Sequence, residues 1–104
     1  MSTSELAQPR EETVGPVLER TPLAEAVVAA IVALNPQAEI QERGAYLRVL
    51  APLRCRVTRQ EIERQARREF HFPRDLEALM PSFKGTLRLD EEEALWEASP
   101  GGPP

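Results

Sequence analysis

The sequence predicts an α+β fold with a largely antiparallel sheet, built as a single compact domain. At 104 residues the chain is long enough for one domain and too short for two ordinary ones. Its 41% hydrophobic and 29% charged residues are typical of a globular protein. Strand-like patterns of period two are grouped between two helical stretches, and this order favours an α+β protein.

The first part of the chain predicts a strand followed by a helix, and the helix begins after Thr21. The apolar run at residues 14–18 predicts a strand, and because Pro16 has no N–H to donate, we expect that strand at a sheet edge or with an irregular start. Thr21 is the helix N-cap and Pro22 the first helical position, while Asn35 ends the helix because a proline follows it. The helix is apolar nearly all round, which indicates deep burial or a shared surface: one stripe holds Leu23, Val27, Ile31 and Leu34, and Val28 and Val32 lie off it.

The middle of the chain predicts three strands and a second helix. Residues 39–49 form two strands around a turn, and residues 53–57 alternate apolar and basic side chains, which is typical of an edge strand. Thr58 and Glu61 form a capping box, in which the threonine accepts from the third amide and the glutamate reaches back to the cap. The inward positions of the helix that follows are Ile62, Ala66 and Phe70.

The last third predicts a short helix and a hairpin. Pro73 interrupts the second helix, and residues 75–80 form a short further piece with its leucines inward. Residues 84–89 and 94–97 then pair as a hairpin around the acidic turn at residues 90–93.

We expect the folded domain to span residues 14–98. Residues 1–13 are polar and predict a flexible arm, and residues 99–104, SPGGPP, predict a disordered tail. A lone cysteine, Cys55, precludes an intramolecular disulfide and favours a reducing, cytoplasmic location. The N-terminus lacks a signal-peptide core, and no apolar stretch reaches the roughly 20 residues of a membrane span. We therefore expect a soluble protein without a membrane partner.

Patterns that indicate catalysis or metal binding are sparse. Cys55 and His71 form the one candidate nucleophile–base pair, but Cys55 lies mid-strand between two arginines and His71 at a helix end, so a packed thiol and a surface imidazole are favoured. The acidic run at residues 90–93 lacks the ligand alternation and glycine of a calcium loop. No glycine-rich phosphate loop occurs in the sequence. We expect no catalytic residue, metal or cofactor.

Positive charge is concentrated between residues 54 and 74, although the net charge of the chain is −4. A small α+β domain can bind nucleic acid through such a segment. Against this, the segment has no interleaved aromatic platform, nearby glutamates can neutralise it, and the acidic remainder would repel phosphates. An ordinary solvated face and a charged docking rim for a protein are the alternatives for Arg54, Arg56, Arg59, Arg64, Arg67, Arg68 and Arg74.

A family resemblance runs through the folded domain and is carried by Val14-Gly15-Pro16, Asn35-Pro36, Glu39-Ile40, Glu42-Arg43, Tyr46, Arg48, Val49, Thr58, Glu61, Glu63, Phe70, Leu76-Glu77, Ser82-Phe83, Gly85 and Asp90-Glu91. In this order and spacing they resemble the effector (coupling or regulatory) proteins of soluble diiron monooxygenases. The effectors of toluene monooxygenases are the most similar, and those of phenol hydroxylase and methane monooxygenase are more distant.

The resemblance implies a domain of two similar strand–helix–strand–strand halves. It also implies a regulatory subunit without metal or activity, which binds the hydroxylase component and tunes its active-site geometry, rate, coupling and product choice. A Rieske-type ferredoxin or a reductase is expected to share the surface in time, and the free effector is expected to be a monomer. Residues 67–72 stand where relatives have a glycine helix end, so we expect a longer second helix here.

The resemblance also indicates where the hydroxylase binds. The turn before the hairpin is expected to face it, with a turn that merely buries Phe83 as the alternative. The first strand can order on binding, the outer face of the first helix competes with core burial, and the second helix can steer an acidic partner. The residues concerned are Met80, Pro81, Ser82, Phe83 and Gly85 in the turn, Val14, Gly15 and Pro16 in the strand, Val28 and Val32 on the first helix, and Arg64, Arg67 and Arg68 on the second.

Two other functions remain open at this point. One is a nucleic-acid-binding domain that uses residues 54–74, for which salt-dependent retention on DNA or RNA would be the sign. The other is a stand-alone small-molecule sensor, which a ligand would stabilise against melting without any protein partner.

Overall fold

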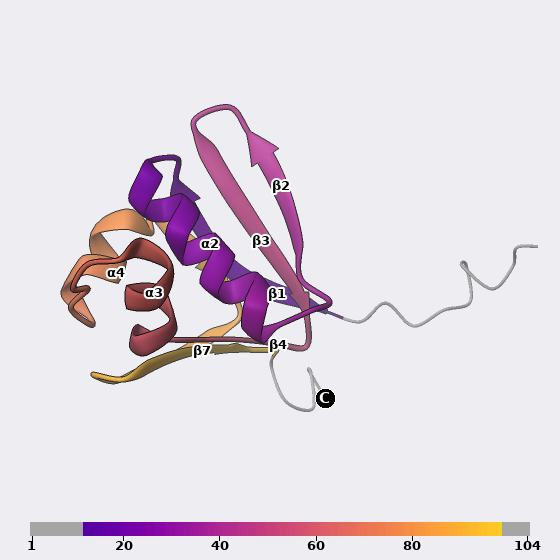
Figure 1. The fold of residues 1–104 in the computed structure, drawn as a ribbon. Helices are drawn as coiled ribbons and strands as arrows, with labels where there is room; N and C mark the ends of the chain where they lie inside the picture. Colours follow the sequence, from indigo (N-terminus) through magenta and orange to yellow (C-terminus); the bar gives the residue numbers. More distant parts are fainter. Residues whose placement is uncertain (1–11, 99–104) are drawn as a thin grey trace, which may run out of the picture.

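The computed structural model describes residues 12–98 and confirms the α+β fold (Figure 1). All strand pairs in this range are antiparallel. The predicted tail and residues 1–11 of the predicted arm lie outside the described residues. The last two residues of that arm are ordered: the Glu12 carbonyl accepts from the Leu53 N–H at 2.8 Å, and Thr13 belongs to the first strand. The elements are β1 (Thr13–Glu19), α2 (Pro22–Leu34), β2 (Glu39–Arg43), β3 (Tyr46–Pro52), β4 (Arg54–Thr58), α3 (Arg59–Ala66), α4 (Arg74–Leu79), β5 (Ser82–Lys84), β6 (Thr86–Leu89) and β7 (Glu93–Glu97).

Two sheets share one core. The first has the strand order β2-β3-β1-β5 and the second the order β4-β7-β6. The halves β1-α2-β2-β3 and β4-α3-β6-β7 repeat the same order of elements, as the resemblance implied, and α4 and β5 are inserted in the second half. Helices α2 and α3 contact each other, and α2 also contacts β4. The largest fully buried side chains come from both halves and include Trp96, Phe70, Leu18, Ile31 and Ile62.

β1 is an interior strand, so the expectation that Pro16 places it at an edge is wrong. Its pairing with β3 is interrupted at Gly15 and Pro16, and these two residues pair with β5 on the other side. The missing N–H of Pro16 is therefore accommodated at a gap in one ladder. Gly15, at φ +146°, approaches the backbone of Val49 so closely that a Cβ would lie 2.5 Å from the Val49 oxygen.

Both predicted helix N-caps are confirmed. Thr21 Oγ1 accepts from the Ala24 N–H at 3.0 Å, and Thr58 Oγ1 accepts from the Glu61 N–H at 3.1 Å. The Glu61 carboxylate accepts from the Gln65 amide, so it points along the helix instead of reaching back to the cap. The buried face of α2 is shifted toward small residues: Ala24, Val27, Ala30 and Ile31 are buried, whereas Leu23 and Leu34 of the predicted stripe are only partly buried.

Asn35 ends α2 as predicted and also fastens it to β4. Its Nδ2 donates to the carbonyl oxygens of Ile31 and Arg56, both at 2.7 Å, and its Oδ1 accepts from the Arg56 N–H at 3.0 Å. β4 is an edge strand of the second sheet, as its sequence predicted. The Asn35 amide therefore occupies the N–H and C=O that a further strand would otherwise pair.

α3 is shorter than predicted, because it ends at Ala66 and does not continue to Phe70. Arg67, with φ 59° and ψ 40°, adopts the left-handed conformation in which glycine usually ends a helix. Phe70 is fully buried beyond the helix, and its N–H donates to Glu63 Oε2 at 2.9 Å. Arg67 thus takes the place of the glycine that was expected at this helix end, and the helix ends here without it.

The chain between α4 and β7 forms two short strands, where the sequence predicted a turn followed by one strand. β5 pairs with β1 in the first sheet, and β6 pairs with β7 in the second. Gly85 separates them at φ +107°, and a Cβ there would lie 2.8 Å from Val14 Cγ1. Ser82 and Phe83 of the predicted turn therefore lie in a strand, and Phe83 is 44% exposed instead of being buried by the turn.

Charged side chains connect α3 to the β6–β7 turn. Arg59 contacts Glu63 Oε2 at 3.1 Å and Glu92 Oε1 at 3.0 Å. The Phe70 N–H that donates to Glu63, with a smaller effect from Arg59, lowers the pKa of the Glu63 carboxyl despite its partial burial. At the turn, Asp90 Oδ1 accepts from two backbone N–H groups at 2.8 and 2.9 Å, and these bonds lower the pKa of Asp90.

Thermal stability is expected to fall as the pH decreases below about 4.5. Glu63 and Asp90 have lower pKa values in the folded chain than in the unfolded chain, so folding favours their charged forms. This stabilisation is present above the unfolded pKa values, which are about 4, and is lost as the pH falls through the lower folded values. Melting curves of Glu63→Gln between about pH 3 and pH 7 are expected to show a weaker pH dependence than those of the parent chain.

Glu77→Gln is the matched control for this measurement, because Glu77 is exposed on α4 and forms no ion pair within residues 12–98. Its melting temperature is expected to follow the parent curve. An equally steep acid decline in the Glu63 variant would contradict the assigned role of that carboxylate.

Candidate functional site

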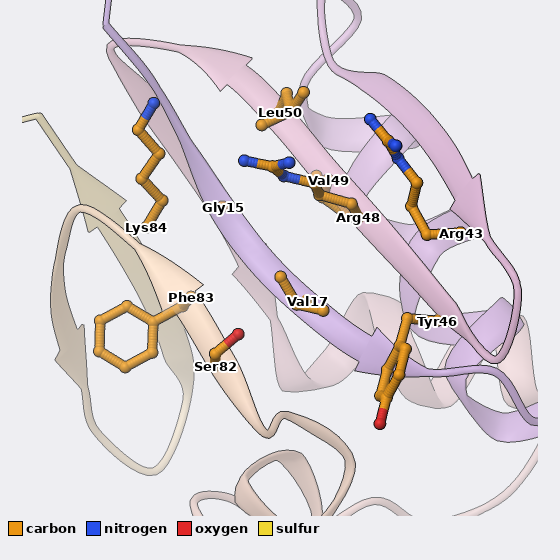
Figure 2. A pocket seen from close by; sticks show the side chains of 10 residues that line it. All are labelled: Gly15, Val17, Arg43, Tyr46, Arg48, Val49, Leu50, Ser82, Phe83 and Lys84. Atoms are coloured by element: carbon orange, nitrogen blue, oxygen red, sulfur yellow. The ribbon is translucent and has the colours of Figure 1, made fainter.

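The outer face of the first sheet is open to solvent, and Figure 2 shows it with the helices behind the sheet. Side chains along β3 alternate between this face and the core. The inward set is buried and consists of Leu47, Val49 and Ala51, while the outward set is partly or fully exposed and consists of Tyr46, Arg48 and Leu50.

A shallow hollow of about 460 Å³ lies on this face (Figure 2). All four strands line it, with Arg43 on β2, Arg48 on β3, Val17 on β1 and Ser82 on β5. Cross-strand pairing places Arg48, Val17 and Ser82 in one row across the sheet. Phe83 lines the margin and extends from β5 away from β1. The hollow is open, so it suits contact with a broad surface better than enclosure of a small molecule.

Three cationic side chains surround the hollow: Arg43, Arg48 and Lys84. Within residues 12–98 none of them forms an ion pair, and the Arg43 guanidinium donates to the neutral Gln41 side chain at 3.0 Å. The Arg-rich segment differs, because Arg56, Arg59, Arg64 and Arg74 each lie within ion-pair distance of an acidic neighbour. Local pairing thus neutralises much of the segment that could have bound nucleic acid.

The structure brings some of the predicted docking residues to this face. Gly15, Ser82 and Phe83 line the hollow together. Pro81 is exposed just before β5, and Gly85 is half-buried after it. The remaining members of these two predicted groups, Val14, Pro16 and Met80, are buried, so their side chains belong to the core.

The predicted helical residues lie elsewhere. On α2, Val32 is 42% exposed but Val28 is half-buried against the core. Arg64, Arg67 and Arg68 are exposed at the end of α3. The predicted residues therefore occupy several surfaces and do not form one continuous site.

Sequence reasoning missed the cations of the outer face. The alternation along β3 was a usable signal for Arg48, since it placed that residue opposite to the buried Leu47 and Val49. No local signal marked Lys84 as a neighbour of Arg48, because their proximity depends on the pairing of β5 with β1. That pairing joins segments far apart in the chain.

Cys55 is fully buried on β4 opposite Trp96, and burial raises the pKa of its thiol to about 12. The thiol is protonated at neutral pH and is a poor nucleophile, so the interpretation as a packed thiol is confirmed. His71 is exposed. Within residues 12–98 no three His, Cys, Asp or Glu side chains gather into a group that could hold a metal ion. In the same range, no helix combines the length and apolarity needed to cross a membrane.

The fold and this face define a class of protein: a small α+β domain that presents an open, partly charged sheet surface. Residues 12–97 match the MmoB/DmpM family, and the chain belongs to that family. The effector subunit of the alkene monooxygenase system of Xanthobacter autotrophicus (strain ATCC BAA-1158 / Py2) is 39% identical over 98 residues, which cover 92% of this chain and 96% of that protein.

Solved structures share the fold at lower sequence identity. A chain in the structure of a phenol hydroxylase–regulatory protein complex superposes with a TM-score of 0.74 at 21% identity, covering 84% of this chain and 98% of that chain. The soluble methane monooxygenase regulatory protein B gives a TM-score of 0.67 at 18% identity, covering 91% of this chain and 70% of that chain. The family resemblance in the sequence is thereby confirmed.

Proposed function

We propose that this chain is the effector subunit of a multicomponent diiron monooxygenase, and that it binds and regulates the hydroxylase component without catalysing a reaction itself. The observation that carries the proposal is family membership over residues 12–97, together with 39% identity to an effector subunit across nearly the whole of both chains. The open outer face of the first sheet supports it, because a broad surface of polar and apolar side chains suits a protein partner.

Regulation by such a subunit needs no chemical group of its own. The effector shifts the hydroxylase by binding its active conformation more tightly than its resting one. A difference of about 1–3 kcal/mol changes the balance of the two conformations about 5- to 150-fold. Active-site geometry, rate, coupling and product choice would all follow from this one difference in affinity.

The type of monooxygenase is a finer part of the proposal. The sequence pattern favours a toluene-type hydroxylase with an aromatic substrate, whereas the relative at 39% identity belongs to an alkene monooxygenase system. We keep the toluene type as the proposal and treat small alkenes as the second substrate class to assay. We further propose that the free chain is a cytoplasmic monomer and that a Rieske-type ferredoxin or a reductase uses an overlapping surface of the hydroxylase in turn.

Titration of this chain into the cognate hydroxylase and its electron-transfer components is expected to raise both the turnover rate and the ratio of product to NADH consumed. Both quantities are expected to saturate near one effector per hydroxylase active site, because the effector acts by stoichiometric binding. Toluene and propene would be assayed in parallel by gas chromatography, with NADH followed by absorbance.

Samples without hydroxylase are the control and are expected to give no product. Unchanged rate and unchanged coupling for both substrates, with the chain shown to be folded by circular dichroism, would contradict the proposal. A response to propene alone would retain the effector function and replace the toluene type.

A further inference from the structure

Arg48 lies at the centre of the outer face of the first sheet. It pairs with Gln41 on one side and with Val17 on the other, and Val17 pairs in turn with Ser82. Arg43 and Lys84 stand on the two edge strands, and in Figure 2 the Arg48 guanidinium lies between the ends of their side chains. The three cations therefore span the sheet from one edge to the other.

The cations of this face lack the acidic neighbours that most other arginines of residues 12–98 have, Arg54, Arg67 and Arg68 excepted. The chain carries a net charge of −4, and Arg20, Arg56, Arg59 and Arg88 all form ion pairs. Arg43, Arg48 and Lys84 form none within residues 12–98, although they lie on three strands of the same sheet and line one hollow. Like charges held near one another without counter-ions weaken the isolated domain slightly, so a partner that supplies carboxylates gains their full attraction.

Apolar side chains lie among these cations. Val17 and Leu50 are half-buried between the strands, Tyr46 is 42% exposed, and Phe83 at the margin is 44% exposed. Arginine and aromatic side chains beside apolar ones are the usual composition of the energetically important part of a protein interface.

We propose that the outer face of the first sheet is the surface that docks on the hydroxylase, and that it recognises an acidic surface patch through Arg48, Arg43 and Lys84. This inference rests on the proposed function and adds the docking face and the chemistry of its partner. The cations orient the approach, and Val17, Leu50 and Tyr46 supply the area that is desolvated on contact.

The composition of the face favours an acidic protein over a nucleic acid. Glu19 pairs with Tyr46 and Glu39 pairs with Leu50, so two carboxylates lie at the corners of the same face. A continuous phosphate backbone would meet both, whereas a protein surface can place cations or neutral groups opposite them. Tyr46 is the one aromatic residue in the cross-strand rows of this face within residues 12–98, which gives bases little to stack on.

The test compares charge reversal at this face with the same charge reversal elsewhere. Arg48→Glu removes the central cation, Arg48→Lys keeps its charge, and Arg88→Glu makes the equal change in total charge at an exposed position on β6 of the second sheet. Affinity for the cognate hydroxylase would be measured by isothermal titration calorimetry at about 0.05 and 0.5 M salt, a range over which screening of surface charge changes strongly. Melting curves would establish that each variant is folded.

Arg48→Glu is expected to weaken hydroxylase binding about tenfold or more at low salt, while Arg48→Lys and Arg88→Glu stay within about threefold of the parent. The parent affinity is expected to fall with added salt, and that of Arg48→Glu much less. A folded Arg48→Glu variant that binds as tightly as the parent would overturn the docking face and leave the effector function intact. An equal loss in Arg88→Glu would also overturn it, because the effect would then follow the total charge of the chain and not this face.

Failure of the parent chain to bind the hydroxylase at all would instead overturn the proposed function, and this inference with it. A short single-stranded DNA serves as the second probe. Binding of that DNA by the parent more tightly than the hydroxylase, with loss in Arg48→Glu, would replace the acidic protein by a nucleic acid.

Discussion

Replacing Gly15 with alanine is expected to destabilise the domain by about 3 kcal/mol or more. Gly15 has φ +146°, a region that residues with a Cβ rarely adopt, and its Cβ would lie 2.5 Å from the Val49 carbonyl oxygen. That oxygen belongs to the backbone of β3, so relief would require the two central strands of the first sheet to move apart. Urea unfolding would measure the loss, which corresponds to a decrease in melting temperature of about 12 °C or more.

Gly44→Ala is the matched control. Gly44 also has a positive φ of +62°, in the turn between β2 and β3, but no atom lies within 4 Å of the position of a Cβ. Its replacement is therefore expected to cost only the conformational term, about 1 kcal/mol. Similar losses for the two variants would show that the close approach of β1 to β3 does not matter to stability.

Asn35→Asp is expected to destabilise the domain by about 2 kcal/mol. The change keeps the shape of the side chain, but it replaces the donor that serves the carbonyl oxygens of Ile31 and Arg56 with a charged acceptor. Two attractive contacts of 2.7 Å thereby become repulsive, and the C-terminal end of α2 gains an unfavourable negative charge. Urea unfolding at neutral pH would measure the effect.

Gln37→Glu gives the same change in net charge two residues later, at an exposed position. It is expected to alter stability by no more than about 0.5 kcal/mol. An Asn35→Asp variant as stable as this control would mean that the bonds between Asn35 and Arg56 do not hold α2 against β4.

The parts of the fold that were predictable have local causes. The N-caps at Thr21 and Thr58, the helix end at Asn35 and the turn at Gly44 each depend on residues within a few positions of one another. The alternation of apolar and basic side chains in β4 likewise matches the structure, where Cys55 and Val57 are buried and the arginines are exposed. Such features need only the backbone preferences and periodicity of a short segment.

The errors arose where distant segments meet. Pro16 indicates an edge strand by itself, yet β1 lies inside the sheet because the ladder to β3 is interrupted there and β5 pairs on the other side. The division at Gly85 depends on its close approach to Val14, which the local sequence does not contain. Arg67 takes a conformation typical of glycine, and residue type gave no indication of it.

The residues of the candidate site also fall into two groups, one that the sequence predicted and one that depends on strand pairing. Ser82, Phe83 and Gly15 were predicted as docking residues from the family pattern, and the structure places all three around one hollow. Arg43, Arg48 and Lys84 form a group only after β2, β3, β1 and β5 have paired, so the group is a property of the sheet order. Family patterns can point to a surface, but pairing decides which charges gather on it.

Trp96 gives the domain an internal probe. It is the only tryptophan of the chain, it is fully buried on β7, and its Nε1 has no hydrogen-bond partner within residues 12–98. It belongs to the second sheet, whereas the proposed docking face belongs to the first. A fluorine on this indole would give a single NMR resonance that tryptophans of a partner cannot obscure. Rigid association would broaden that resonance in place, whereas association that repacks the interior would shift it, so one spectrum distinguishes docking from internal rearrangement.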